Sequence, residues 1–374
     1  MAVDPVVPRY TGRSLAGLVP ALRADPDARP GWLPGAARSA PRCVLLVLDG
    51  LGHEQWWPRR AMTPTMAAMA GVPIESVAPT TTATALTSIT TGAAPADHGL
   101  VGYRLVVDGP DGSPEVMNAL RWRTASGDAR AFVDPVGFVR PEPFGGDPVP
   151  VVSRRDFEGS GFSTAHLRGT RSVGWSLPST IPVAVARLVD EGEAFVYAYY
   201  EGVDKIAHIA GLGDEYDAEL VFADRLVADL LDVLPPDVAL VVTADHGEVE
   251  VGDRVEPIDE AVLEEAALVS GEARFRWFHA RPGRAAALAA LVAERYGQTA
   301  WVRTVEEVEE GRWFGGALDP VTRARLGDVA LAACEPVAYL EPADGDTRLV
   351  CRHGSLTAAE VVVPLLAAPG RRAP

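Results

Sequence analysis

The sequence predicts an α/β fold, a mostly parallel sheet covered by helices on both faces, with a smaller inserted cap region. Three apolar segments rich in β-branched residues end in acidic residues, as buried parallel strands do: CVLLVLDG (43–50), AFVYAYYEGVD (194–204) and VALVVTADHG (238–247). Between the last two, apolar side chains of residues 214–234 recur on one helical stripe: Leu220, Val227, Leu230, Leu231 and Leu234. A strand, a helix and a strand at this spacing form a βαβ unit, which favours a parallel sheet.

Two stretches interrupt this pattern, and we expect both to be insertions into a single domain that spans residues 1–374. Residues 105–160 are rich in Pro, Gly and Asp and predict an irregular insert. Residues 249–341 contain a helical pattern that Gly297 stops and the capping-box sequence TVEE at 304–307. Because strand-end motifs stand on both sides of this second stretch, we expect a cap-like insert on one core.

The composition narrows the class of protein. A hydrophobic content of 48% against 23% charged residues predicts a packed globular chain. The net charge of −17 disfavours nucleic acid and anionic membranes as partners, although a bound metal ion can reverse the local sign for an anionic substrate. The N-terminal segment lacks the apolar core of a signal peptide, and no run approaches the ~20 apolar residues of a membrane span, so we expect a cytoplasmic protein. The three cysteines lack CxxC spacing and imply no disulfide framework.

Acidic and histidine side chains gather where the predicted strands end. In open parallel sheets, ligands bind beyond the carboxyl ends of the strands. The candidate residues there come from four separate segments: Asp49, Asp204, His208, Asp245, His246 and His353. Each alone also fits a turn, a helix cap or a core position, but together they form a reasonable ligand set for two divalent ions. Zinc accepts imidazole nitrogen together with carboxylate oxygen, and a catalytic zinc site leaves one position for water or substrate.

The stretch APTTTATALTSITTG, residues 78–92, holds seven threonines and one serine. Low-complexity linkers are also rich in hydroxyl groups, but Ala, Leu and Ile recur here at helical spacing before Gly92. The alternative is a catalytic hydroxyl at a helix N-terminus, where free N–H groups and the helix dipole favour an anion.

The order LVLDG, APTTTATALTSITTG, YYEGVDKIAHIAG, TADHG and HGS resembles the alkaline phosphatase superfamily, and most of all its nucleotide pyrophosphatase/phosphodiesterase branch. The resemblance implies an alkaline phosphatase-like fold and hydrolysis of a small-molecule phosphate ester with two divalent ions, zinc or alternatively manganese. It implies that Thr82 is the nucleophile, activated by a bound ion and passing through a covalent phospho-threonine. Carried over by position, it assigns two ligand sets: Asp204, His208 and His353 to one ion, and Asp49, Asp245 and His246 to the other.

The sequence departs from the family pattern at two positions. Tyr103 stands where many phosphodiesterase relatives have an Asn that binds a phosphoryl oxygen, so Tyr103 is a candidate substrate-binding residue. Ala207 stands where relatives often have Gly before the metal-binding histidine.

Several other functions remain open. A phosphomonoesterase or phosphonate hydrolase of the same superfamily is the first alternative, although the sequence pattern assigns no Lys or Arg to the extra charge of a monoester. A sulfatase is disfavoured because the sequence has no Cys-x-Pro-x-Arg stretch. A catalytically silent, metal-stabilised binding protein is the alternative from another class, and the presence of the nucleophile and all six ligands argues against it. The oligomeric state is not predicted.

Overall fold

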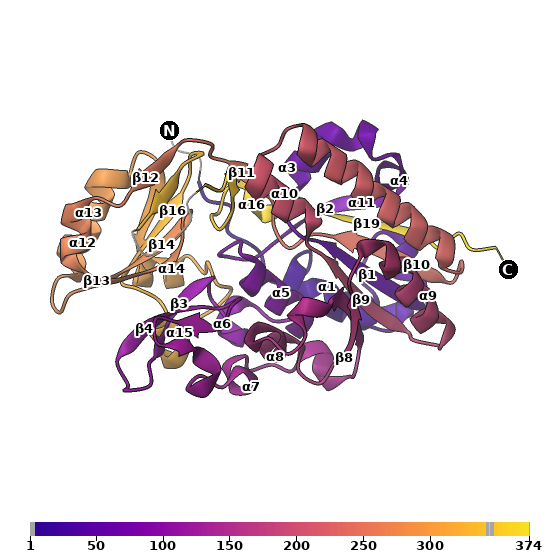
Figure 1. Ribbon diagram of the computed structural model, residues 1–374, viewed down its shortest axis with the longest axis horizontal. Coiled ribbons are helices and arrows are strands. Elements are labelled where there is room, and N and C mark those ends of the chain that lie inside the picture. Colours follow the sequence, from indigo (N-terminus) through magenta and orange to yellow (C-terminus); the bar gives the residue numbers. More distant parts are fainter. Residues whose placement is uncertain (1–3, 342–343, 345–347, 374) are drawn as a thin grey trace.

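A seven-stranded sheet forms the centre of the larger part of the molecule in the computed structural model, which describes residues 4–341, 344 and 348–373 (Figure 1). Its strands lie in the order β2 (Ala70–Glu75), β19 (Val362–Pro369), β10 (Val238–Thr243), β1 (Arg42–Leu48), β9 (Phe195–Tyr200), β7 (Pro150–Arg154) and β8 (Arg171–Trp175). Only β19 runs antiparallel to its neighbours β10 and β2, and the other pairs are parallel. The predicted α/β fold with a mostly parallel sheet is confirmed.

The three predicted strands are the central ones. β1 pairs in parallel with β9 on one side and with β10 on the other. All residues of β9 and β10 are buried, as are all of β1 after Arg42, which explains their continuous apolar sequences. Since the three strands run side by side in one direction, their carboxyl ends meet at one edge of the sheet.

Helices cover both faces of this sheet (Figure 1). On one face lie α9 (Ile181–Asp190), α10 (Gly202–Ala210) and α11 (Asp214–Val233), and on the other lie α1 (Leu15–Arg23) and α5 (Thr82–Thr91). The predicted stripe of α11 is buried at Leu220, Val227, Leu230 and Leu231. None of the described helices combines the length and the apolar composition needed to cross a membrane.

Residues 105–160, expected to be irregular, contain regular structure. The antiparallel strands β3 (Arg104–Asp108), β4 (Pro114–Asn118), β5 (Arg123–Thr124) and β6 (Gly127–Asp128) form a small sheet, and β7 belongs to the main sheet. The many prolines of this segment argue against strands, because proline cannot donate a hydrogen bond within a sheet. Pro114 and Pro150, however, each occupy the first position of a strand, where proline is tolerated.

Residues 249–341 contain a second sheet, which lies to one side of the main sheet (Figure 1). Its antiparallel order is β13 (Ala266–Glu272), β14 (Phe275–Ala280), β16 (Val329–Ala333) and β15 (Ala300–Thr304). The helices α12 (Glu260–Glu265), α13 (Ala285–Tyr296) and α14 (Val305–Glu310) accompany it. Gly297 follows α13, and the predicted capping box of Thr304 and Glu307 starts α14.

The sequence TAAE at 357–360 also has the pattern of a capping box, but the structure does not form one. Helix α16 (Ala358–Val361) begins after Thr357, but the Thr357 side chain accepts no backbone hydrogen bond. Its hydroxyl donates to Glu360 instead, over 2.6 Å. The Glu360 carboxylate is fully buried and binds Arg274, so a partner far away in sequence overrides the local cap.

The remaining helices and strands are short: α2 (Gly35–Ser39), α3 (His53–Trp56), α4 (Pro64–Ala68), α6 (Pro95–His98), α7 (Pro135–Phe138), α8 (Gly161–Leu167), α15 (Pro320–Ala324), β11 (Val249–Glu250), β12 (Val255–Pro257), β17 (Ala338–Leu340) and β18 (Cys351–Arg352).

Candidate metal centre and nucleophile

Three carboxylates meet at the carboxyl ends of the central strands. Asp49 follows β1, Asp204 lies in the first turn of α10 after β9, and Asp245 follows β10. The Asp204 amide donates to the Asp49 carbonyl over 2.9 Å, and the Gly50 amide donates to Oδ1 of Asp245 over 3.1 Å. Gly50 has a φ of 74°, and a Cβ there would lie 2.8 Å from Cα of Asp204. The Asp-Gly turn therefore requires glycine for both its conformation and this close approach.

The three predicted histidines are oriented by backbone carbonyl groups. Nδ1 of His208 lies 2.7 Å from the carbonyl oxygen of Cys351. Nδ1 of His246 lies 3.2 Å from the carbonyl oxygen of Gly247, and Nδ1 of His353 lies 2.7 Å from that of Thr80. Because a carbonyl can only accept, Nδ1 carries the proton in each ring and Nε2 keeps its lone pair. This is the arrangement that metal-binding histidines use in proteins.

The ligand atoms form two adjoining groups, within each of which all atoms lie within 4.8 Å of one another. One group consists of Asp49, Asp245 and His246, and the other of Asp204, His246, Glu248 and His353. Oδ1 of Asp204 also lies 3.2 Å from Nε2 of His208. All six predicted ligands are thus in one cluster, and His246 borders both groups.

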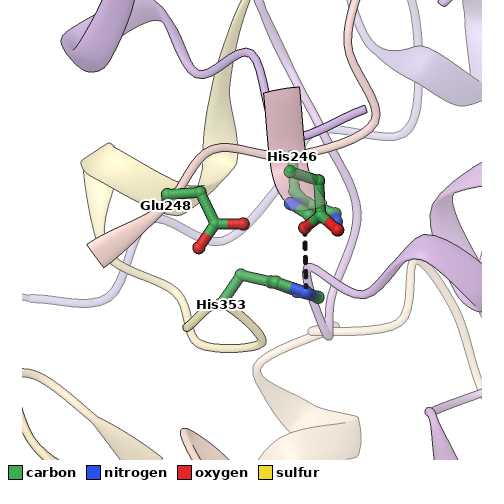
Figure 2. A group of neighbouring side chains, drawn as sticks. His246, Glu248 and His353 are labelled. Atoms are coloured by element: carbon green, nitrogen blue, oxygen red, sulfur yellow. Dashed lines mark ion pairs between the residues drawn. The ribbon is translucent and has the colours of Figure 1, made fainter. Parts of the chain in front are cut away.

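Glu248 is a member of the cluster that the sequence analysis did not select. It is an acidic residue two positions after His246, in the segment between β10 and β11. That spacing after the Asp-His pair is the one signal in the sequence that points to it. Figure 2 shows its carboxylate turned toward the space between the rings of His246 and His353.

Several buried carboxylate oxygens of the cluster have no hydrogen-bond partner: Asp49 Oδ1, Asp204 Oδ1, Asp245 Oδ2 and both oxygens of Glu248. Burial raises the pKa of Asp49 well above its usual range, and the carboxylates of Asp245 and Asp204 add to this effect. Unpaired buried acids are costly, and divalent cations would satisfy them. The donor set of carboxylate oxygen and imidazole nitrogen therefore fits two divalent ions.

The predicted nucleophile Thr82 is the first residue of α5 and is 8% exposed. Its Oγ1 lies 3.2 Å from Nε2 of His246. The hydroxyls of Thr87, Thr90 and Thr91 bond to carbonyl groups one turn earlier in the same helix. These three hydroxyls therefore serve the helix, whereas the hydroxyl of Thr82 faces the ligand cluster.

Thr80 links the turn before α5 to the loop of His353. Its carbonyl faces Nδ1 of His353, and its hydroxyl donates to the Ser355 carbonyl over 2.7 Å and accepts from the Gly354 amide over 3.1 Å. The nucleophile turn and one metal-ligand loop are thus held together.

A cavity of about 370 Å³ opens beside Thr82, Asp49 and Asp204. Aromatic, hydroxyl and acidic side chains line it, and none of its described lining residues is Arg or Lys. Tyr199 lines it as well and donates a hydrogen bond to Oδ2 of Asp49.

The predicted substrate residue Tyr103 is not among the described residues that line this cavity. Its hydroxyl instead accepts a hydrogen bond from Nδ2 of Asn118 over 2.7 Å. His98, the histidine that follows the nucleophile helix, lies fully buried between Ser88 and the Leu100 amide, which is a structural position.

Solved structures with the same fold support the architecture. Murine ectonucleotide pyrophosphatase/phosphodiesterase 5 superposes with a TM-score of 0.67 at 15% identity over 87% of each chain. An inactive variant of that protein in complex with AMP gives a TM-score of 0.66 at 14% identity, again over 87% of each chain. Phosphonoacetate hydrolase from Sinorhizobium meliloti 1021, in complex with phosphonoacetate, gives 0.63 at 21% identity over 90% of this chain and 91% of that one. At these identities the similarity shows the fold, which is alkaline phosphatase-like as predicted.

A search among curated proteins gives no match. The sequence profile described as type I phosphodiesterase / nucleotide pyrophosphatase, by contrast, matches residues 43–186 and 176–356. These ranges span most of the chain and include Thr82 and all six predicted ligands. The match confirms the resemblance and the expected class of enzyme, a hydrolase of phosphoric esters. The chain belongs to the type I phosphodiesterase/nucleotide pyrophosphatase family.

Proposed function

We propose that this protein is a two-metal hydrolase that cleaves phosphodiester or nucleotide pyrophosphate bonds, with Thr82 as the nucleophile. One observation carries the proposal. The hydroxyl at the start of α5 lies 3.2 Å from Nε2 of His246, which borders both groups of ligand atoms. A hydroxyl at that place can attack a phosphorus atom that is bound beside both ions.

The chain's own residues would hold the ions in two sets, Asp204, His208 and His353 for one and Asp49, Asp245 and His246 for the other. Zinc is the first candidate for both positions and manganese is the second. Bound divalent ions would lower the pKa of the threonine hydroxyl and neutralise charge on the phosphate group.

In the proposed reaction Thr82 is the nucleophile, and the start of α5 stabilises the phosphate oxygens. Oγ1 of Thr82 gives up its proton and attacks phosphorus, an O–P bond forms, and the bond to the leaving alcohol or phosphate group breaks, with a proton passing to that leaving group. The free N–H groups and the positive dipole end at the start of α5 stabilise the non-bridging oxygens. Water then cleaves the phospho-threonine and restores the hydroxyl, so two displacements retain the configuration at phosphorus.

The charge of the cavity favours a diester over a monoester. A phosphomonoester carries an additional negative charge, whereas none of the described residues that line the cavity is Arg or Lys. The nearby Arg154 is already paired with two acidic lining residues, Asp156 and Glu201. A phosphonate hydrolase is the second candidate, because phosphonoacetate is bound in one of the similar structures. Phosphonoacetate carries a carboxylate besides its phosphonate, and the described cavity wall offers no cation to either group.

The test compares hydrolysis of bis-p-nitrophenyl phosphate, p-nitrophenyl phosphate and phosphonoacetate by metal-stripped protein reloaded with zinc or manganese. We expect the diester to be cleaved with the highest kcat/KM, and the Thr82→Ala variant to cleave none of them. A preference for the monoester or the phosphonate would overturn the diester assignment. Absence of turnover with two ions bound would favour the binding-protein alternative.

A further inference from the structure

Glu248 has the features of a metal ligand. The residue is 1% exposed, and neither oxygen of its carboxylate has a hydrogen-bond partner among the described residues. Its main chain is anchored, because Nε2 of Gln55 donates to the Glu248 carbonyl. An acidic side chain held in the interior in this way needs a positive partner, since an unpaired buried charge is strongly destabilising.

Three electron-pair donors lie close to the Glu248 carboxylate. One of its oxygens lies within 4.8 Å of ligand atoms of Asp204, His246 and His353. Figure 2 shows the side chains of His246 and His353 converging on Glu248. Glu248, Asp204 and His353 thus present three donors to one space, which His246 of the other ligand set also borders. With no described ion pair to the Glu248 carboxylate, this is what a cation site requires.

The number of ligands then bears on the identity of the ion. Asp204, His208 and His353 are the three ligands that the proposed function assigns to this ion, and Glu248 would be the fourth. Four protein ligands close a tetrahedral zinc site, which would leave no position for the phosphate oxygen. An octahedral ion with the same four ligands keeps two positions free, and manganese favours carboxylate and water oxygen in octahedral geometry.

We propose that Glu248 is a direct ligand of the divalent ion held by Asp204 and His353, and that it makes this position selective for manganese over zinc. This inference rests on the metal sites of the proposed function. The rival explanation is a protonated Glu248 that shares its proton with the neighbouring carboxylate of Asp204 and binds no ion.

Metal titration of the full chain distinguishes the two explanations. Stripped wild-type protein, Glu248→Gln and Glu248→Asp are titrated with Mn²⁺, with free Mn²⁺ followed by its EPR signal, and with Zn²⁺ against a chelator. We expect Glu248→Gln to weaken one of the two Mn²⁺ sites at least about tenfold and to weaken Zn²⁺ binding less, because the amide oxygen is a poorer ligand for a hard ion. Glu248→Asp retains the charge and should recover part of the Mn²⁺ affinity.

The matched control is Glu250→Gln, which changes an exposed acid two residues further along the chain. It should bind both ions as the wild type does. Circular dichroism and thermal unfolding of the metal-free variants show whether each is folded, which we expect for Glu248→Gln because a neutral amide of the same size replaces an unpaired buried charge.

Each remaining outcome has one meaning. Unchanged Mn²⁺ binding in Glu248→Gln would overturn the ligand role and favour the protonated Glu248 of the rival explanation. The amide of Gln, like a protonated acid, can donate a hydrogen bond to Asp204. Equal losses for Mn²⁺ and Zn²⁺ would overturn the preference for manganese. A wild-type chain that binds fewer than two ions would instead overturn the metal sites of the proposed function, whatever Glu248 does.

Discussion

Oγ1 of Thr82 and Nε2 of His246 lie 3.2 Å apart although 164 positions separate the two residues in the sequence. Thr82 is fixed by the start of α5, and His246 by the loop that follows β10. Both side chains are short and buried, so the backbone of two packed elements sets the distance between them. The proposed nucleophile is therefore positioned before any substrate arrives, which is how enzymes reduce the entropic part of a reaction barrier.

Replacement of Thr82 by Ala should abolish turnover of bis-p-nitrophenyl phosphate and leave the metal content near that of the wild type. The hydroxyl is lost, while the six predicted ligands stay in place. Thr91→Ala, at the other end of α5, is the matched control and should keep both activity and metal. Metal analysis and steady-state kinetics on the same samples check this, and turnover by Thr82→Ala would mean that another group is the nucleophile.

Replacement of His208 by Ala should lower the bound metal by about one ion per chain together with the activity. The substitution removes an imidazole whose Nε2 lies 3.2 Å from Oδ1 of Asp204 and whose Nδ1 faces the Cys351 carbonyl. His53→Ala is the control, because His53 stacks on Trp57 and is outside the ligand groups of the described residues. Full metal content in His208→Ala, measured by atomic emission, would contradict the ligand assignment.

His98 should make the protein sensitive to acid. Burial lowers the pKa of His98 to about 3, and the positive charges of Arg140 and Arg325 add to the effect. The folded state thus binds this proton less readily than the unfolded state, so stability is full above the unfolded pKa of 6.5 and falls as the pH decreases from 6.5 toward 3. Between pH 7 and pH 5 the loss from this one group is on the order of 2 kcal/mol.

The structural reason is that Nδ1 of His98 accepts from the Leu100 amide over 3.1 Å, so a second ring proton would disrupt that bond. Denaturant unfolding of His98→Asn and the wild type at pH 7 and pH 5 measures the effect. We expect a smaller change with pH in the variant, whatever its stability at pH 7. Equal changes with pH in the two proteins would show that His98 does not carry this dependence.

The buried pair of Arg274 and Glu360 should contribute to stability only as a pair. Both side chains are fully buried, and they form two hydrogen bonds of 2.7 and 3.0 Å. Arg274→Met would leave the Glu360 carboxylate buried and unpaired, at a cost of about 3–5 kcal/mol. The double replacement Arg274→Met with Glu360→Leu should recover most of this loss in urea unfolding, and additive losses would argue against such coupling.

Much of the site could be predicted because the carboxyl ends of strands in a parallel sheet lie together and are where ligands bind. Asp49 and Asp245 follow continuous apolar runs, and the sheet brings the ends of such runs together. Glu248 could not be selected in the same way, since it lies in a loop where no periodicity distinguishes a ligand from a solvated acid. Glu248 is recognised as a candidate ligand only in the structure, where side chains from other segments lie beside its carboxylate.

The strands that the sequence did not predict depend on distant partners. β19 contains Pro364, and a proline within an apolar run argues against an inner strand. The capping-box pattern at 357–360 just before β19 also favours a helix, but α16 is only four residues long, and Glu360 binds Arg274 from the turn between β13 and β14. β7 was not predicted because prolines surround it. Its parallel pairing with β9 joins residues more than forty positions apart, so no local pattern indicates the strand.

The bonds between Thr80 and Gly354 have a consequence for local unfolding. The amide of each residue donates to an oxygen of the other, and the Thr80 carbonyl also binds the ring of His353. Neither segment can open without breaking the bonds of the other, so the two form one cooperative unit in hydrogen exchange. The Thr80 and Gly354 amides should therefore exchange at a common rate, and deuterium uptake would report the loosening of the nucleophile turn and of the His353 loop as a single event.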